Sequence, residues 1–315
     1  MQQRAFGSTS LRVSEIGLGC ARIGGIFQQD PRGFSNLLDA AYDSGIRFFD
    51  TADIYSQGES ETLVGKAFRG RRNAVVIATK AGYVLPAQRQ LIARIKPLVR
   101  PLIKALGIRR DKLPAAVRGT ITQNFSPAYL KGALEASLKR LRTDYVDLLQ
   151  LHSPPRSVIE RGDWLRALED LKRAGKVRYF GLSCDTIDAA EAALRVPGAS
   201  SLQVVVNLLE QGAAPSVLPE AQARNVAVIA RECLANGLLV KEEHELDLKA
   251  FCSSPEQEAE RRERLGQLRR EARERGVTLA RLALDYVLRA KGVSVALVGT
   301  RNREQLQGVL RGLAS

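Results

Sequence analysis

The sequence predicts an α/β protein, folded over residues 1–315 as a single closed (β/α)8 barrel, the TIM barrel. Short apolar, β-branched segments alternate with longer amphipathic segments, and there are eight such pairs. The apolar segments are nearly continuous, which is typical of parallel strands that are buried on both faces. A length of 315 residues also suits one barrel of this kind.

The first four pairs come before residue 175. Apolar runs predict strands at residues 14–19 (SEIGLG), 46–50 (IRFFD), 74–79 (AVVIAT) and 145–151 (YVDLLQL). The helices expected after them cover residues 34–43, 59–68, 127–141 and 164–174. In the first of these helices, Leu37, Leu38, Ala41 and Tyr42 recur at helical spacing. Residues 17–22 read GLGCAR and lack the third glycine of a Rossmann phosphate loop, which disfavours an open doubly wound sheet.

The last four pairs follow the same rule. Strands are expected at residues 177–183 (VRYFGLS), 202–206 (LQVVV), 226–230 (VAVIA) and 293–298 (VSVALV), and helices at residues 187–194, 215–223, 279–290 and 303–310. Residues 256–275 predict a further, solvated helix in which acidic and basic residues are interleaved. No aromatic side chain is available in that segment to stack on bases, so the pattern argues against nucleic acid as a partner.

One interval, residues 82–126, is too long for an ordinary loop between a strand and a helix. Its segment 88–106 is basic and amphipathic, and Pro97 and Pro101 would interrupt a continuous membrane-surface helix. Because it follows the third strand, we expect the interval to form a lid over the active-site face. Its basic side chains would then face water or an acidic partner, such as a phosphorylated substrate or a carrier protein.

Composition narrows the class of protein. Hydrophobic residues make up 45% and charged residues 26% of the chain, which is ordinary for a globular protein. No apolar run is long enough to span a membrane and the first residues lack a secretory signal, so we expect a cytoplasmic protein. The net charge of +14 is scattered along the chain, which is typical of an Arg-rich surface and also suits a phosphate-bearing ligand. The four cysteines and two histidines lack the spacing of a zinc site, and no metal is expected.

Titratable side chains gather where the predicted strands end. Asp50, Lys80 and His152 each end or directly follow a strand, and Tyr55 lies on the loop that begins at Asp50. In a barrel of parallel strands these ends meet at one rim. An ammonium beside a tyrosine favours the phenolate and lowers the phenol pKa, a carboxylate keeps the lysine charged, and a neutral imidazole can orient a carbonyl group. Such a set suits protonation of an oxygen while a hydride from a nicotinamide cofactor reaches the carbon.

At these residues the chain resembles the aldo-keto reductase family. The motifs are FFDTADIY at 48–55, ATK at 78–80, DLLQLH at 147–152, GKVRYFGLS at 175–183 and VGTRNREQL at 298–306. The resemblance implies that Tyr55 is the general acid and base, that Lys80 and Asp50 tune its pKa, and that His152 orients the substrate carbonyl. It also implies which residues bind NADPH or NADP⁺: Ser183 and Gln203 hold the carboxamide with Asn207 close by, and Thr300, Arg301 and Gln305 contact the adenosine end.

Three positions depart from the family pattern. The usual Ser-Asn pair after the fifth strand is Ser183-Cys184, and the usual Glu-Asn pair in the last helix is Gly308-Val309. Arg231 replaces the aromatic residue that stacks under the nicotinamide, and its guanidinium could stack there or pair with a cofactor phosphate.

The sequence leaves three functions open. The first is NADPH-dependent reduction of an aldehyde or ketone, a small-molecule carbonyl substrate. The second is the reverse reaction, an NAD(P)⁺-dependent sugar or alcohol dehydrogenase. The third is a cofactor-sensing regulatory subunit with little turnover, as the potassium-channel β subunits of that family are. An NADPH preference is expected from Arg301, which precedes the last helix where a 2′-phosphate can bind.

Overall fold

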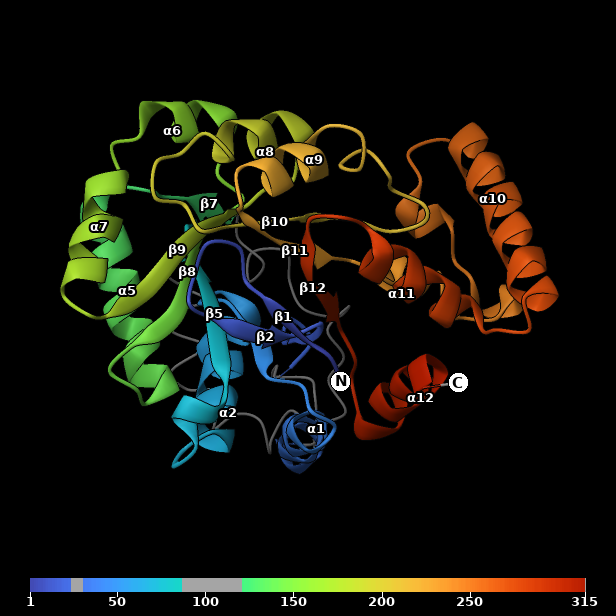
Figure 1. Ribbon diagram of the computed structural model, residues 1–315, viewed down its shortest axis with the longest axis horizontal. Helices are drawn as coiled ribbons and strands as arrows, with labels where there is room; N and C mark the ends of the chain where they lie inside the picture. Colours follow the sequence, from blue (N-terminus) through green and yellow to red (C-terminus); the bar gives the residue numbers. More distant parts are fainter. Residues whose placement is uncertain (24–30, 87–120, 315) are drawn as a thin grey trace.

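In the computed structural model, which describes residues 1–23, 31–86 and 121–314, eight parallel strands close into a barrel (Figure 1). They are β3 (Ile16–Gly19), β4 (Phe48–Asp50), β5 (Val76–Ala81), β8 (Val146–His152), β9 (Val177–Ser183), β10 (Ser201–Val205), β11 (Ala227–Arg231) and β12 (Val293–Val298). Neighbours in the barrel follow chain order, and β12 pairs with β3 to close the ring. The predicted (β/α)8 barrel is confirmed.

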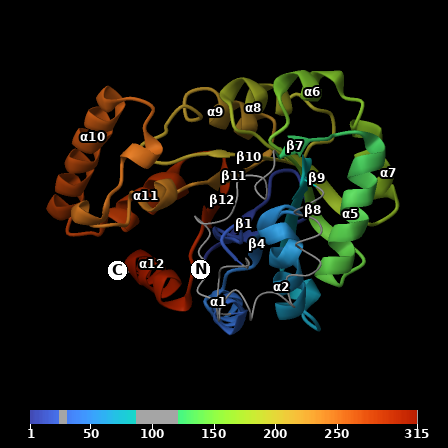
Figure 2. The same cartoon turned by 180° about the vertical axis from the view of Figure 1, so that it is seen from behind.

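Helices surround the barrel, as the view from behind also shows (Figure 2). After successive strands come α1 (Pro31–Asp43), α2 (Glu59–Ala67), α5 (Pro127–Leu141), α7 (Leu165–Arg173), α8 (Ile187–Ala193), α9 (Val217–Ala223), α11 (Leu279–Arg289) and α12 (Arg303–Ala314). Several begin where the sequence provides a cap: the side chains of Ser126, Thr186 and Thr278 accept a hydrogen bond from the third residue of the following helix. Pro127 occupies the first helical position of α5, where its missing N–H is not needed.

Further helices and 3-10 turns lie between these elements. They are the helices α6 (Arg156–Arg161) and α10 (Pro255–Glu274) and the 3-10 turns η1 (Tyr55–Gly58), η2 (Arg72–Ala74), η4 (Ala235–Gly237), η5 (Glu243–Glu245) and η6 (Lys249–Phe251). The predicted charged helix is α10, which lies at the outer edge of the molecule beside α11 (Figure 1). It is held by Leu265, Leu268 and Ala272, which are its buried residues. No helix within the described ranges combines the length and apolarity that crossing a membrane requires.

The first strand differs from its expectation. The barrel strand β3 begins at Ile16, whereas the residues before it form an antiparallel hairpin of β1 (Gln3–Ala5) and β2 (Arg12–Ser14). Phe6, Leu11 and Val13 of this hairpin are buried in one cluster with residues inside the barrel, among them Phe48. The hairpin therefore closes the amino-terminal end of the barrel, and its strands were missed because QRA and RVS lack the apolar run that marks the barrel strands.

Inside the barrel, side chains change from apolar to polar along each strand. The inner cluster contains Phe48 of β4, Val76 and Ala78 of β5 and Leu148 of β8. Because successive side chains of a strand alternate between faces, the next inward positions are Asp50, Lys80 and Gln150, and all three are buried. The lower layers are thus an apolar core, and the layer at the carboxyl ends is polar.

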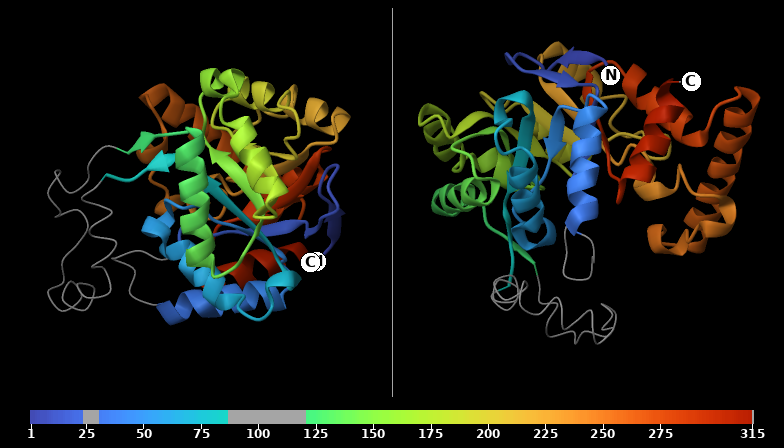
Figure 3. Two further views of the ribbon diagram at one scale, coloured as in Figure 1. Left: turned by 90° about the vertical axis from the view of Figure 1, so that its left-hand side faces the viewer. Right: turned by 90° about the horizontal axis from the view of Figure 1, so that it is seen from below.

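After β5 the chain leaves the barrel in a short antiparallel hairpin. Its strands are β6 (Tyr83–Val84) and β7 (Thr122–Gln123), which stand out from the body of the molecule (Figure 3). The segment 88–106 on which the lid prediction depends lies outside the described residues.

We expect Gly181→Ala to lower the free energy of unfolding by about 3 kcal/mol, the upper end of typical overpacking costs. A Cβ atom at this position of β9 would lie 2.1 Å from Ser201 Oγ and 2.4 Å from the Ser201 carbonyl oxygen of the neighbouring strand. Gly132→Ala, in the exposed middle of α5 with open space around it, should instead raise the unfolding free energy by about 0.5–1 kcal/mol. Urea denaturation of both variants checks this, and equal effects would contradict the packing argument.

Candidate active site

The polar layer at the carboxyl ends of the strands brings the predicted residues together. Asp50, Lys80 and His152 come from β4, β5 and β8, and Ser183 is the last residue of β9. The loop after β4 turns Tyr55 toward Lys80, with Ser56 and Gln57 in left-handed backbone conformations directly after the tyrosine. Asp50, Tyr55, Lys80, His152 and Ser183 were all named from the sequence.

A buried ammonium lies at the centre of the layer. Lys80 Nζ lies 2.5 Å from Asp50 Oδ2, 3.1 Å from the Thr51 carbonyl oxygen and 3.4 Å from the Tyr55 hydroxyl oxygen. These three acceptors match the three hydrogens of an ammonium group. Burial by itself would lower the pKa of Lys80, but Asp50 and Tyr55 raise it above its ordinary value, so the side chain is charged.

The other oxygen of Asp50 is also engaged. Asp50 Oδ1 accepts hydrogen bonds from Gln150 Nε2 at 3.2 Å and from Gln203 Nε2 at 3.0 Å. Gln203 Oε1 in turn accepts a hydrogen bond of 3.0 Å from Ser183 Oγ. Sequence reasoning missed Gln150, although its place two residues before His152 on an inward face was a usable signal.

The pKa of Tyr55 differs from the sequence-based expectation. Burial raises it above its ordinary value, Lys80 acts in the opposite direction, and Asp50 adds to the rise. The ammonium therefore limits the rise but does not bring the pKa below 10. The phenol keeps its proton at neutral pH, which is the form that a proton donor requires.

His152 is neutral. Burial, then the positive charges of Lys80 and Arg231, hold its pKa well below 6.5. Its ring lies edge-on to Tyr55 at 5.7 Å between centroids and to Tyr83 of β6 at 4.7 Å. Its Nδ1 atom is buried and has no hydrogen-bond partner among the described residues. A neutral imidazole beside the tyrosine is suited to donate one hydrogen bond to a substrate oxygen.

A cavity of about 1040 Å³ begins at this layer and extends past the end of β12 to α12. Seven of the residues predicted from the sequence line it: Asp50, Tyr55, Gln203, Arg231, Thr300, Arg301 and Gln305. Gly308 and Val309 line it as well, so the position of the usual Glu-Asn pair faces the cavity. Lys80, His152 and Ser183 are not among the lining residues, but each contacts one of them: Lys80 and His152 contact Tyr55, and Ser183 donates to Gln203.

The cavity wall is basic. Six basic and three acidic side chains line it: Arg22, Arg231, Lys241, Arg269, Arg273 and Arg301, against Asp50, Glu232 and Glu242. Of the basic residues, only Arg231 and Arg301 were named from the sequence. At the far end, Thr300 is buried, and its hydroxyl oxygen has no partner in the described part of the chain. An elongated, polyanionic ligand such as a dinucleotide fits the size, charge and unpaired hydroxyl of this cavity.

The guanidinium group of Arg231 lines the cavity and is held in place by hydrogen bonds and ion pairs. Its Nη2 donates to Asp185 Oδ1 at 2.7 Å and to the Cys184 carbonyl oxygen at 3.3 Å, and its Nη1 pairs with Glu232. Asn207, by contrast, does not contact the cavity. Its amide is buried, accepts hydrogen bonds from the backbone N–H groups of Leu209 and Glu210, and donates to the Glu232 carbonyl oxygen. It braces a loop and does not line the cavity.

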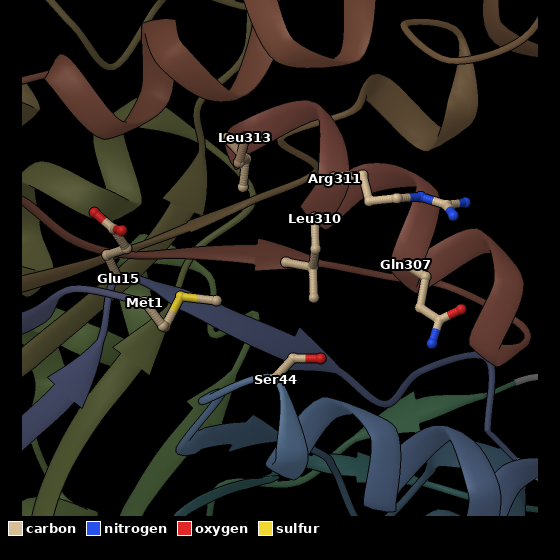
Figure 4. A pocket seen from close by; sticks show the side chains of 7 residues that line it. All are labelled: Met1, Glu15, Ser44, Gln307, Leu310, Arg311 and Leu313. Carbon is tan, nitrogen blue, oxygen red and sulfur yellow. The ribbon is translucent and has the colours of Figure 1, made fainter. Parts of the chain in front are cut away.

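A second cavity, of about 550 Å³, lies at the opposite end of the barrel (Figure 4). It is bordered by Met1, by Ser44 after α1, and by Leu310 and Leu313 of α12. None of the active-site residues contributes to it.

The chain is similar to known proteins over nearly its whole length. The model of the aldo/keto reductase family matches residues 15–314. Pyridoxal 4-dehydrogenase of Microbacterium luteolum is 29% identical, over 97% of this chain and 91% of its own length. The aldo-keto reductase YhdN of Bacillus subtilis is 30% identical, over 98% of this chain and 88% of its own. Among solved structures, the holo form of an aldo-keto reductase from Bacillus halodurans covers 100% of this chain and 91% of its own, with 28% identity and a TM-score of 0.79. A glycerol dehydrogenase from Gluconobacter oxydans has a TM-score of 0.77 and 26% identity, over 98% of this chain and 88% of its own.

The neutral state of His152 can be tested directly, because the chain has only one other histidine, His244. Since the pKa of His152 is well below 6.5, its imidazole resonances should stay constant as the pH falls from 8 to 5.5. NMR of histidine-labelled protein measures this, and the spectrum of His152→Gln assigns the signal. A midpoint near 6.5 for His152 would contradict the electrostatic argument.

Proposed function

This chain belongs to the aldo/keto reductase family, and we propose that it is an NADPH-dependent oxidoreductase that reduces an aldehyde or ketone to an alcohol. The observation that carries the proposal is the hydrogen-bonded chain from Asp50 through Lys80 to Tyr55 at one end of the basic cavity. The cofactor, when bound in that cavity, supplies a hydride to the carbonyl carbon.

The residues of this chain then have separate tasks. His152, being neutral, donates a hydrogen bond that orients the substrate carbonyl oxygen. Tyr55 gives its proton to that oxygen as negative charge develops there. Lys80 stabilises the phenolate that Tyr55 becomes, and Asp50 keeps the ammonium charged and aimed. The buried layer excludes water, which strengthens each of these charge interactions.

The proposed cofactor contacts follow the length of the cavity. Gln203 and Ser183 lie beside Asp50 and would hold the nicotinamide carboxamide. The guanidinium group of Arg231 lies at the same end of the cavity. Thr300, Arg301 and Gln305 lie at the other end, where α12 begins. Arg301 and Thr300, whose hydroxyl has no partner among the described residues, would hold the 2′-phosphate of NADPH.

A second candidate is the reverse reaction, oxidation of an alcohol or sugar. It is favoured by the names of the relatives, which include a pyridoxal dehydrogenase, an aldose dehydrogenase of Pseudomonas and a glycerol dehydrogenase. The raised pKa of Tyr55 favours reduction at neutral pH, because oxidation requires the phenolate as proton acceptor. Steady-state rates in both directions, with a panel of aldehydes, ketones and ketosugars, discriminate between the two. Oxidation of bound NADPH in a single slow turnover, with no substrate turned over repeatedly, would instead indicate a cofactor-sensing subunit.

We expect Tyr55→Phe to lower the reduction rate at least about 10²-fold while NADPH still binds, because the ring remains and the transferable proton is lost. Stopped-flow rates and fluorescence titration of NADPH measure the two effects. Tyr145→Phe is the control, since that hydroxyl donates to Asn73 on the surface. Near-normal turnover by Tyr55→Phe would exclude Tyr55 as the proton donor.

Arg301→Ala should weaken NADPH binding about tenfold or more and leave NADH binding almost unchanged, since only NADPH carries the 2′-phosphate. Dissociation constants for the two cofactors measure this. Arg303→Ala, two residues further along and outside the cavity wall, is the control. Equal losses for both cofactors would show that Arg301 does not select the phosphate.

A further inference from the structure

Asp53 is a half-buried acid in the active-site loop, and the proposed reaction gives it no role. It lies between Asp50 and Tyr55 in the sequence, and its backbone N–H donates to the Lys80 carbonyl oxygen at 3.1 Å. Although part of the residue reaches the surface, its Oδ1 atom is closed off from solvent and has no hydrogen-bond partner among the described residues. A buried carboxylate oxygen without a partner is costly, whereas a protonated carboxyl is far less so.

A second buried carboxylate faces Asp53 from α2. Glu61 is fully buried, accepts a hydrogen bond of 2.6 Å from Thr79 Oγ1 and pairs with Arg140 Nε of α5 at 2.6 Å. Arg140 is thus paired with Glu61, although its charge also attracts the charged form of Asp53. Two carboxylates near one guanidinium repel each other, and the charged form of the one without the direct ion pair, Asp53, is disfavoured.

The other groups that face Asp53 do not reverse its preference for the protonated form. Lys80 of β5 attracts the charged form, but its ammonium is directed at Asp50, and Tyr129 of α5 is a neutral phenol whose hydroxyl donates to the Tyr83 carbonyl oxygen. Burial and then Glu61 raise the pKa of Asp53 to about 7, against the opposing effects of Arg140, a backbone N–H and Lys80.

We propose that Asp53 is a positioning residue whose carboxyl keeps its proton in the folded protein while Glu61 pairs with Arg140, so that the Lys80 ammonium is shared between Asp50 and Tyr55 alone among the described side chains. The proton on Asp53 therefore helps to set how readily Tyr55 becomes a phenolate. When Asp53 ionises, a second negative charge beside Lys80 opposes that phenolate. This inference rests on the proposed function for its effect on the reaction, but not for the protonation of Asp53.

The protonation is tested without any reaction, by urea denaturation of the full chain from pH 5 to 8. In the folded state Asp53 keeps its proton up to about pH 7, whereas unfolded it ionises near 3.8. The stability of the wild type should therefore fall, relative to Asp53→Asn, as the pH rises toward 7, and the difference should level off above it. Asp43→Asn, on an exposed residue at the end of α1, should show no such difference. A difference between wild type and Asp53→Asn that is independent of pH overturns the inference.

Glu61→Gln gives the same test in a chain that keeps Asp53. Removing the like charge leaves Arg140 free to pair with Asp53, so the pH range of the stability loss should move to lower pH. An unmoved range would show that Glu61 is not the cause, and it would overturn the proposed pair.

The effect on Tyr55 is tested by the pH profile of alcohol oxidation. Asp53→Asn should move the alkaline midpoint of kcat to lower pH by about half a unit, the size of one partly screened charge, with reduction at pH 6 nearly unchanged. Equal losses at every pH would show a merely structural residue. If the stability result holds but neither reaction occurs, the proposed function fails and the protonation of Asp53 stands.

Discussion

The polar layer at the carboxyl ends of the strands depends on one buried ion pair, that of Lys80 with Asp50. Taking a lysine and an aspartate out of water is unfavourable unless each remaining hydrogen and lone pair finds a partner. Here the ammonium has three acceptors, and the carboxylate oxygens accept from Lys80, Gln150 and Gln203. Because these partners come from several strands and from the loop after β4, the pair ties the mouth of the barrel together. It also fixes the only positive charge in hydrogen-bond range of the Tyr55 hydroxyl among the described residues.

The barrel can accommodate a buried ion pair because its polar side chains are confined to one layer. Below it, the inner positions are apolar and closed from the amino-terminal side by the hairpin with Phe6, Leu11 and Val13. The stability of the fold therefore comes from layers that do not contact the proposed substrate. The polar layer can therefore contain a tyrosine with a raised pKa, a neutral histidine and a protonated Asp53 at the same time, because the apolar layers beneath it stabilise the barrel.

The basic cavity connects this layer to α12, and it depends on helices that are distant in the sequence. Arg269 and Arg273 of α10 face the same space as Arg301 before α12. Helix α10 carries interleaved charges along its whole length, and only its packing beside α11 turns two of its arginines toward the cavity. A scattered net charge of +14 becomes in this way a local excess of positive charge suited to phosphates.

By itself the sequence determined the barrel, because eight apolar runs followed by amphipathic segments bury both faces of a sheet only in a closed parallel arrangement. It also determined that Asp50, Lys80 and His152 meet, since parallel strands end at one rim. It did not reveal the strands of the hairpin, which lack an apolar run, or the hydrogen bonds by which Asn207 holds a loop. Only the tertiary structure decided the balance of charges. Whether burial or a neighbouring ammonium prevails in setting the pKa of Tyr55, and whether the carboxyl of Asp53 keeps a proton, depends on distances and on access to water that no spacing in the sequence encodes.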